Sequence, residues 1–212
     1  MSTTSTAATT TLNRFARRRE RTRTELLAAA TRVLAEKGLH QTKVSDIAAA
    51  ADVGVGTFYL HFADKEALFD AVVDDTVRRL KATVDDARAR AREPRAKIVA
   101  TNRAFFRFAH DNREVFKIVF GHAAAYNDLI RRAQSLFIAD IEKEVRDGVA
   151  AGAFAQLPPA LVAQAVVGMA TQVISWWTEH ESVPIETLIE TTTTLALHGI
   201  TPGAAAKGAR HG

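Results

Sequence analysis

The chain has 212 residues, of which 47% are hydrophobic and 25% are charged, the composition of a globular protein long enough to bury a core. It contains no cysteine, which excludes disulfides, zinc–thiolate sites and cysteine nucleophiles and favours the reducing cytoplasm as its location. The net charge of +4 comes from residues 1–65, with ten Lys or Arg against six Asp or Glu, because residues 66–212 hold 18 of each.

The first 21 residues join a Thr/Ala/Ser-rich stretch to a run of arginines. They show no charged segment followed by an apolar one, so we expect no secretory signal, and no later window is expected to span a membrane. We expect residues 1–21 to be a disordered basic arm, which either faces a polyanion or is simply a solvated tail. The first 23 residues hold six arginines against the single acid Glu20: Arg14, Arg17, Arg18, Arg19, Arg21 and Arg23.

From about residue 22 the apolar residues take the spacing of an amphipathic helix, which Gly38 is expected to end. Thr42 is placed to cap a short second helix. The sequence Asp-Val-Gly at 52–54 breaks that helix, and a third short helix is expected over about 55–61. Two helices that cross steeply need small residues where they touch, and Ala48 to Ala51 supply them. This pattern predicts a helix-turn-helix, with a plain alanine-packed helical hairpin as the alternative.

The rest of the chain continues in helices, and no alternating pattern predicts a strand. Asp64 caps a long amphipathic helix, and prolines open three later ones. We therefore expect an all-α fold of about nine helices, with a three-helix head over 22–68, a helical ligand-binding and dimerisation domain over 69–200, and a disordered tail over 201–212. The later helices are expected from Pro94, over about 113–120 and 127–148, from Pro158 to about His180, and from Pro184 to Gly199.

Two stretches of the head resemble the TetR (tetracycline-repressor-like) family of transcriptional regulators. Residues 53–68, VGVGTFYLHFADKEAL, are similar to that family's signature of small, aromatic and charged positions. Residues 28–48, AAATRVLAEKGLHQTKVSDIA, are similar to its first helix and the entry into the second. The detailed resemblance covers about residues 22–75, while the remainder matches only in helix count and length.

The resemblance implies a DNA-binding role for the head. Thr42, Lys43 and Val44 would lie beside the DNA backbone. Tyr59, His61 and Lys65 would reach phosphates, and base contacts would come from the start of the third helix, where Val55 and Thr57 could touch a thymine methyl. Arginines of the N-terminal run could add minor-groove contacts. The complete set of predicted DNA-binding residues is Thr42, Lys43, Val44, Gly54, Val55, Gly56, Thr57, Tyr59, Leu60, His61 and Lys65.

The last two helices carry more apolar residues than one buried face requires. The helix from Leu161 to Trp177 is apolar almost all round, so it must be buried on two sides. One side would face its own domain and the other a symmetry mate, which predicts a homodimer through the last two helices. The alternative is a central core helix in a monomer.

An effector site is sought among aromatic and polar groups that a core does not need. Phenylalanines of the middle helices suit a largely apolar ligand such as a fatty acyl compound, a drug or an aromatic metabolite, although such residues more often form a core. The candidate effector residues are Asn102, Phe105, Phe106, Arg107, Phe120, Tyr126, Phe137, Met169, Gln172, Val173 and Trp176.

Together these features predict a sequence-specific DNA-binding regulator, a repressor released from a palindromic double-stranded operator by a small apolar effector. An activator or global regulator with the same head is the alternative. No nucleophile elbow, phosphate-binding glycine loop, paired carboxylates or metal-ligand spacing is found, so we expect no enzyme activity, no metal and no cofactor. His61 stands alone, without a second ligand at metal spacing.

Overall fold

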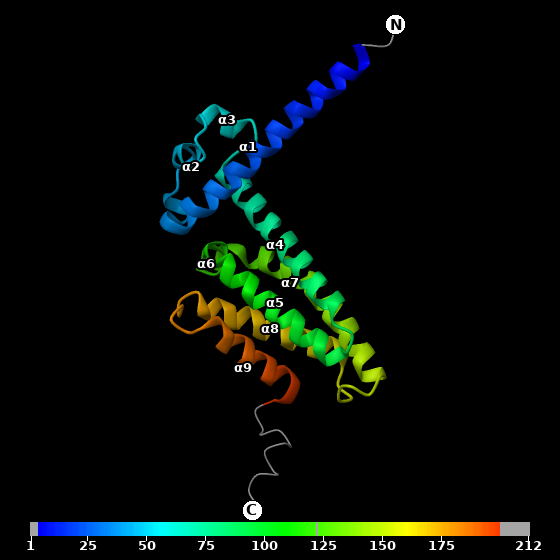
Figure 1. Cartoon of the computed structure of the whole chain (residues 1–212). Helices are drawn as coiled ribbons and strands as arrows, with labels where there is room; N and C mark the ends of the chain where they lie inside the picture. The colour runs from blue at the N-terminus through cyan, green and yellow to red at the C-terminus, as the bar shows by residue number, and fades with distance from the viewer. Residues whose placement is uncertain (1–3, 122, 200–212) are drawn as a thin grey trace, which may run out of the picture. The chain divides into compact units, whose positions relative to one another are not determined.

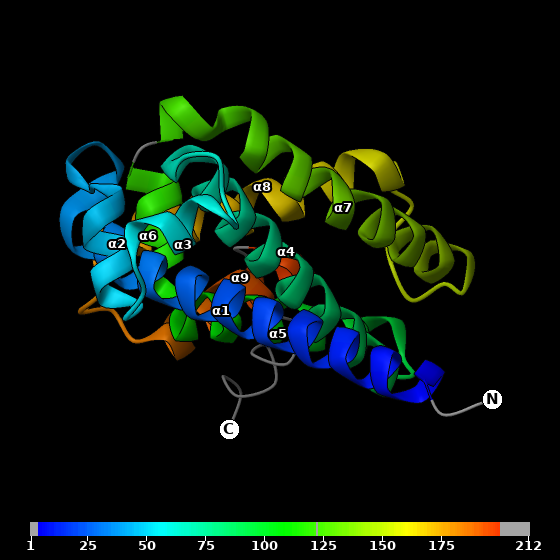
Figure 2. The same ribbon diagram turned by 90° about the horizontal axis from the view of Figure 1, so that it is seen from above.

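The computed structural model describes residues 4–121 and 123–199, and this part of the chain is helical, without a strand (Figures 1 and 2). The prediction of an all-α fold is confirmed. The chain divides into two compact units, the first ending at Thr76 and the second beginning at Val77, so that α4 contributes to both. The helices are α1 Thr4–Gln41, α2 Val44–Ala50, α3 Val55–Tyr59, α4 Lys65–Arg90, α5 Pro94–Asp111, α6 Arg113–Gly121, α7 Ala123–Ala150, α8 Pro159–Trp177 and α9 Ile185–His198.

The N-terminal arm is the first point at which the structure differs from the sequence prediction. Residues 4–21 are helical rather than disordered, because they extend α1 without a break. Arginine, glutamate and alanine are good helix formers, and two contacts reinforce the last turns of this segment. Thr24 Oγ1 donates to the Glu20 carbonyl at 3.0 Å, and Arg21 pairs with Glu25 at 3.1 Å. The predicted tail 201–212 lies outside the described residues.

The head is held together by a small apolar core from the first four helices. Leu26 and Leu34 of α1, Ile47 of α2 and Phe58 of α3 are each at most 1% exposed. Phe69, near the start of α4, is buried with them in the first unit. Full burial of such side chains contributes about 1.5–3 kcal/mol each, which fixes the position of the short helix α3.

Two backbone positions set the turns of the head. Gly38 interrupts α1 with φ 72° and ψ 164°, at the place where the sequence predicts a helix end. In the turn between α2 and α3, Asp52 takes the left-handed conformation with φ 54°. Aspartate tolerates this region better than most residues, so the turn does not depend on glycine there. The N–H of Val53 then donates to the Ala48 carbonyl at 3.0 Å, which closes the turn.

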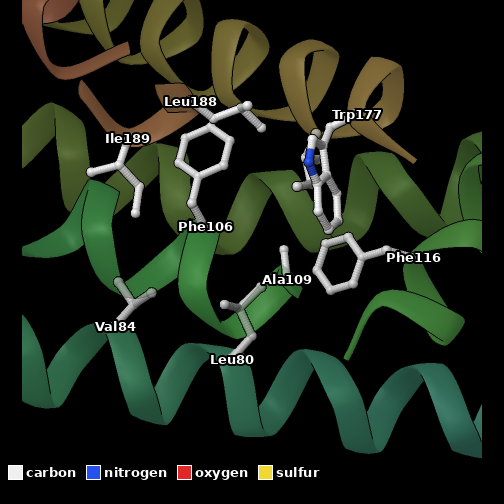
Figure 3. Packing of buried hydrophobic residues seen from close by; sticks show 9 residues of the cluster. Leu80, Val84, Phe106, Ala109, Phe116, Trp177, Leu188 and Ile189 are labelled. Carbon is white, nitrogen blue, oxygen red and sulfur yellow. The ribbon is translucent and has the colours of Figure 1, made fainter. Parts of the chain in front are cut away.

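The second unit has its own core, built from α4, α5, α6, α8 and α9 (Figure 3). Phe106 of α5 lies at its centre, fully buried. Trp177, at the end of α8, is 2% exposed and satisfies its indole N–H by donating to the Val183 carbonyl at 2.9 Å. The cluster consists of Leu80, Val84, Phe106, Ala109, Phe116, Ile174, Trp177, Leu188 and Ile189.

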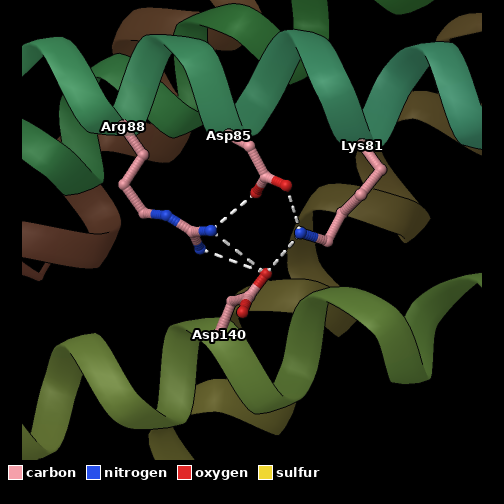
Figure 4. Close-up of polar contacts among 4 residues, drawn as sticks. All are labelled: Lys81, Asp85, Arg88 and Asp140. Carbon is pink, nitrogen blue, oxygen red and sulfur yellow. Dashed lines mark hydrogen bonds and ion pairs between the residues drawn. The ribbon is translucent and has the colours of Figure 1, made fainter.

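A network of four charged side chains joins α4 to α7 in the same unit (Figure 4). Asp140 of α7 pairs with Lys81 at 2.8 Å and with Arg88 at 3.2 Å, and both cations also pair with Asp85 on their own helix. Burial alone would raise the pKa of Asp140, but the hydrogen bond from Lys81 and the charge and hydrogen bond of Arg88 outweigh it and hold that pKa below its usual value. The Asp140 carboxylate is therefore charged at neutral pH.

Helix α8 carries no ionisable side chain over its 19 residues. Among the described residues it is the one helix long and apolar enough to cross a membrane by length and composition. Length and composition alone do not separate a membrane span from a core helix, so the expectation that no segment spans a membrane stays a prediction. Ala163, Val167, Ile174 and Trp177 are buried along one face of the helix.

Candidate DNA-binding surface

The side chains at the start and end of α3 project away from the head core. Val55 is 43% exposed, Tyr59 56% and Leu60 73%, whereas Phe58 between them is completely buried. Because Phe58 anchors the helix, the opposite face of α3 is presented as one continuous surface. An exposed surface of large apolar and aromatic side chains on a short helix is unusual for a solvated face, and it fits a helix that contacts base edges and sugar–phosphate backbone.

Gly54 and Gly56 leave open space at this surface because they have no side chains. A Cβ atom built at either position meets no other atom of the chain within 4 Å. Gly54 has φ −71°, which any residue can adopt, so the fold requires glycine for neither space nor backbone conformation at this position. The missing side chains leave open space beside the start of α3.

His61 follows α3 and is half-buried beside the N-terminal helix. Burial lowers the pKa of His61, and the positive charges of Arg19 and Arg23 lower it further, against the opposing effect of Glu20. The guanidinium carbon of Arg23 lies 5.0 Å from the ring centroid of Phe62, the next residue. Two arginines of α1 are thus brought to the end of α3, a grouping that sequence reasoning missed.

The entrance to α2 shows one predicted contact residue in a different role. Thr42 is only 2% exposed, and its hydroxyl donates to the Gly38 carbonyl at 2.7 Å, so its side chain stabilises the end of α1, while its place beside the DNA backbone stays a prediction. Lys43 is exposed and Val44 half-exposed. The Lys43 backbone N–H donates to the carboxylate of Asp46 at 3.1 Å, and this bond, with an ion pair from Lys37, lowers the pKa of Asp46.

Lys65 also has a role that the sequence does not reveal. Its ammonium donates to the carbonyls of Leu39 at 2.8 Å and Thr42 at 3.2 Å, with a longer contact to His40 at 3.5 Å. These contacts engage the three ammonium hydrogens and satisfy carbonyls at the end of α1. In this structure Lys65 therefore stabilises the head, and its phosphate contact stays a prediction.

Comparison with known proteins decides the family. Residues 26–72 match the model of bacterial regulatory proteins of the tetR family, and residues 91–200, more than half of the chain, match that of the tetracyclin repressor-like C-terminal domain. The chain belongs to the TetR family. It is a DNA-binding transcriptional regulator with an N-terminal helix-turn-helix.

Relatives agree with this assignment over most of their length. The HTH-type transcriptional repressor KstR2 of Rhodococcus jostii is 26% identical over 84% of this chain and 90% of its own. The fatty acid degradation regulator FadR of Bacillus halodurans superimposes with a TM-score of 0.77 at 23% identity, covering 84% of this chain and 95% of its own. FadR of Bacillus subtilis, solved with stearoyl-CoA, gives a TM-score of 0.75 at 19% identity, covering 84% and 99%.

In this TetR-family regulator the predicted effector residues fall into separate groups. Phe106 belongs to the core, while Phe105, Phe120, Phe137 and Val173 are half-buried against it. Met169 is half-buried on α8. The side chain of Tyr126 lies outside the described residues. The first group thus keeps an apolar character, as the prediction requires, but most of its contacts are those of a core.

The polar members of the predicted effector set are engaged elsewhere. Asn102 Nδ2 donates to the hydroxyls of Thr192 and Thr193 at 2.8 Å each, which links α5 to α9. Arg107 pairs with Glu186 at 2.9 Å across the same two helices. These two residues therefore act as interhelical ties, a role that cannot be read from the sequence because their partners are about 80–90 positions away.

Gln172 and Trp176 lie on the exposed face of α8. Trp176 is 45% exposed and stacks on His180, with ring centroids 4.1 Å apart. They share this face with Leu161, which is 66% exposed, and with the small residue Gly168. A Cβ built at Gly168 meets nothing within 4 Å. This face, residues 161, 164, 165, 168, 172 and 176, is uncharged and mostly apolar or small.

Proposed function

We propose that this regulator is a repressor that binds a palindromic operator as a homodimer and is released by a small, largely apolar effector. The observation that carries the proposal is the exposed face of α3, whose side chains and glycines have no use inside the chain. The relative KstR2 is named as a transcriptional repressor, which favours repression by this chain over the alternative of an activator or global regulator with the same head.

The exposed face of α8 supports the homodimer. A helix with one face in the core and an uncharged opposite face needs a second apolar surface to cover it. A second copy of the chain supplies the same face by two-fold symmetry, and the small residues at 165 and 168 permit close helix approach. Two heads held about 34–36 Å apart then meet successive major grooves, so the operator is palindromic.

The apolar character of the second unit supports the effector class. Half-buried phenylalanines on α5, α6 and α7 border the core, and no charged side chain is part of that cluster. Rearranging such side chains around an aliphatic chain or aromatic ring exposes no buried charge. The relative FadR of Bacillus subtilis was solved with stearoyl-CoA, which makes long acyl compounds the first class to screen.

Helix α4 supplies the route from effector to DNA. It is continuous from Lys65 to Arg90, so its first turns belong to the head and its later turns to the second unit. The Lys65 ammonium ties its start to the end of α1. A displacement of α4 is therefore transmitted to the head, and an effector that binds the displaced state better by about 1–3 kcal/mol shifts the population away from DNA.

Binding of the purified protein to its own upstream intergenic duplex tests the proposal. Titration against an unrelated competitor duplex separates specific from general affinity. We expect Tyr59→Ala to lower specific affinity by about tenfold or more, equivalent to about 1.4 kcal/mol, because it removes an exposed contact of α3 without opening the core. Leu157→Ala, at a position 55% exposed in the second unit, is the matched control and should bind like the wild type.

Each part of the proposal has its own contrary outcome. Equal affinity for the upstream and unrelated duplexes would contradict an operator at that site. A Tyr59→Ala variant that binds as tightly as the Leu157→Ala control would contradict α3 as the reading element. Addition of a long-chain acyl-CoA to the preformed complex should release the DNA, and tighter binding in its presence would instead make the ligand a co-repressor.

A further inference from the structure

The N-terminal part of α1 extends beyond the helix-turn-helix and has no place in the core of the head. In both ribbon views its first turns continue past α2 and α3 (Figures 1 and 2). The first buried residue of α1 is Leu26 among those whose side chains are described, so the turns before it contribute no core packing there. Residues 16–21, the described side chains at the start of this extension, are all exposed, so their charge serves no packing role inside the head.

Its last turns before the head carry five arginines and one glutamate. Arg17, Arg18, Arg19 and Arg21 are exposed, and Arg23 is half-buried against Phe62. At 100° per residue these positions surround the helix instead of marking one face, so no single partner helix is matched by them. Arginine presents a fork of donors suited to phosphate oxygens, and such a ring of charge complements a polyanion.

One of these arginines is held next to α3, and a second acts there through its charge. The charges of Arg19 and Arg23 lower the pKa of His61, which lies two residues after the end of α3. Arg23 is held there by its contact with the Phe62 ring, 5.0 Å from the centroid. The basic segment of α1, residues 17–23, is thus continuous with the surface that α3 presents, and both belong to the first unit.

We propose that the basic segment of α1 is a second DNA-contacting element, which binds the phosphate backbone beside the groove that α3 enters. The inference rests on the proposed DNA contact of α3 and extends it to flanking DNA. A helix of about 10–12 Å diameter cannot enter a minor groove about 6 Å wide, so the segment lies on the backbone and only its side chains reach inward. Six residues of rise cover about 9 Å, a length of duplex with about five phosphate charges.

The salt dependence of DNA binding tests this contact, because each phosphate neutralised adds about 0.9 to the slope of log Kobs against log salt. The test variant is the triple replacement Arg17→Gln, Arg18→Gln and Arg19→Gln. The matched control replaces Arg92, Arg95 and Arg103, three exposed arginines of the second unit, with glutamine and lowers the net charge equally. We expect the slope of the test variant to fall by about 2–3 for each bound protomer, hence by about 5 for a dimer, and its affinity by at least about tenfold, with the control unchanged.

Two further measurements make the outcome decisive. Lysine at positions 17, 18 and 19 keeps the charge and the helix, so this variant should retain most of the slope, and circular dichroism confirms that each variant is folded. An equal slope for the glutamine test and control variants would overturn the inference. The slopes of the test and control variants are also compared on an unrelated duplex, where phosphate contacts alone act. This second comparison tests the basic segment of α1 even if the upstream duplex proves not to be the operator.

Discussion

At the scale of single residues, the glycines of α3 separate the demands of the fold from those of DNA binding. Neither Gly54 nor Gly56 is needed to avoid a clash within the chain. In most turns glycine is explained by a left-handed backbone, but in this head Asp52 takes that conformation. We therefore propose that the small size of the residues at 54 and 56 serves the contact with DNA, so a change there should act on DNA affinity and not on folding.

Gly56→Ala tests this separation. Alanine is the better helix former by up to about 1 kcal/mol, and its Cβ meets open space, so the free energy of unfolding should rise or stay level. The same methyl group occupies the space into which the duplex approaches, so operator affinity should fall by about tenfold, or about 1.4 kcal/mol. Thermal unfolding and DNA titration measure the two effects on one sample. Loss of stability, or unchanged affinity, would contradict the interpretation.

At the scale of elements, the charged network of α4 and α7 fixes the later turns of α4. Asp140 forms ion pairs with both Lys81 and Arg88, whose side chains are each about a quarter exposed. Because solvent screens these pairs, their contribution to the stability of the second unit is modest. Because α4 also carries the start of the head, the network resists the displacement of α4 that an effector is proposed to cause. Its strength should therefore influence both the stability of the second unit and the response to effector.

Asp140→Asn measures this contribution. We expect a loss of about 1 kcal/mol in unfolding free energy at neutral pH and release from DNA at a lower effector concentration. The folded pKa of Asp140 lies below its ordinary value of 3.8, so its contribution is complete above that value and is lost as the pH falls through the depressed folded pKa. The difference between variant and wild type should stay constant from pH 5 to 8.

A matched control is available on the same helix. Asp86→Asn removes one partner of the Arg90 pair, which lies within α4 and is highly exposed, so it should cost little at any pH. If both variants unfold alike, the interhelical position of Asp140 has no special role. Denaturant titrations at several pH values, with urea so that salt does not mask the charges, give the comparison.

At the scale of the whole molecule, the order and type of the helices could be predicted from the sequence, because apolar spacing, glycine stops and proline starts are local signals. The head was recognised from residues 28–68, and its core positions follow from the same spacing. Local signals failed for residues 4–21, where a Thr/Ala-rich composition hides a continuous helix. They also do not indicate the intramolecular contacts of Thr42 and Lys65, whose partners are backbone carbonyls that only the fold brings near.

For the effector residues, the sequence predicts only that apolar and aromatic side chains are present, and not which of them contact a ligand. That Phe105 and Phe137 border the core follows from their type, but the ties of Asn102 and Arg107 to α9 depend on which helices become neighbours. Helix pairing is a property of the folded unit, so no local pattern separates a tie from a ligand contact. The exposed face of α8 was predicted better, because an almost wholly apolar helix requires two buried sides wherever it lies.

That face gives the last prediction, which concerns the oligomer. By two-fold symmetry a residue near the centre of the interface approaches its own copy, so one substitution places two like charges together. Gly168→Arg adds a charge at a position where the chain itself leaves open space, and arginine favours the helix. The protomer should stay folded while the dimer dissociates, which sedimentation velocity and circular dichroism measure together. Ala96→Arg, at an exposed position of α5, controls for added charge and should remain dimeric.

Dissociation should also change how the protein binds DNA. A dimer binds both half-sites of an operator in one step, whereas a monomer loses the effective concentration that the second head provides. Gly168→Arg should therefore bind a full operator with an affinity close to that for a single half-site, although its α3 surface is unchanged. A Gly168→Arg variant that remains dimeric would place the interface elsewhere. A monomeric variant with full operator affinity would show that one head suffices, and the palindrome would then lose its physical basis.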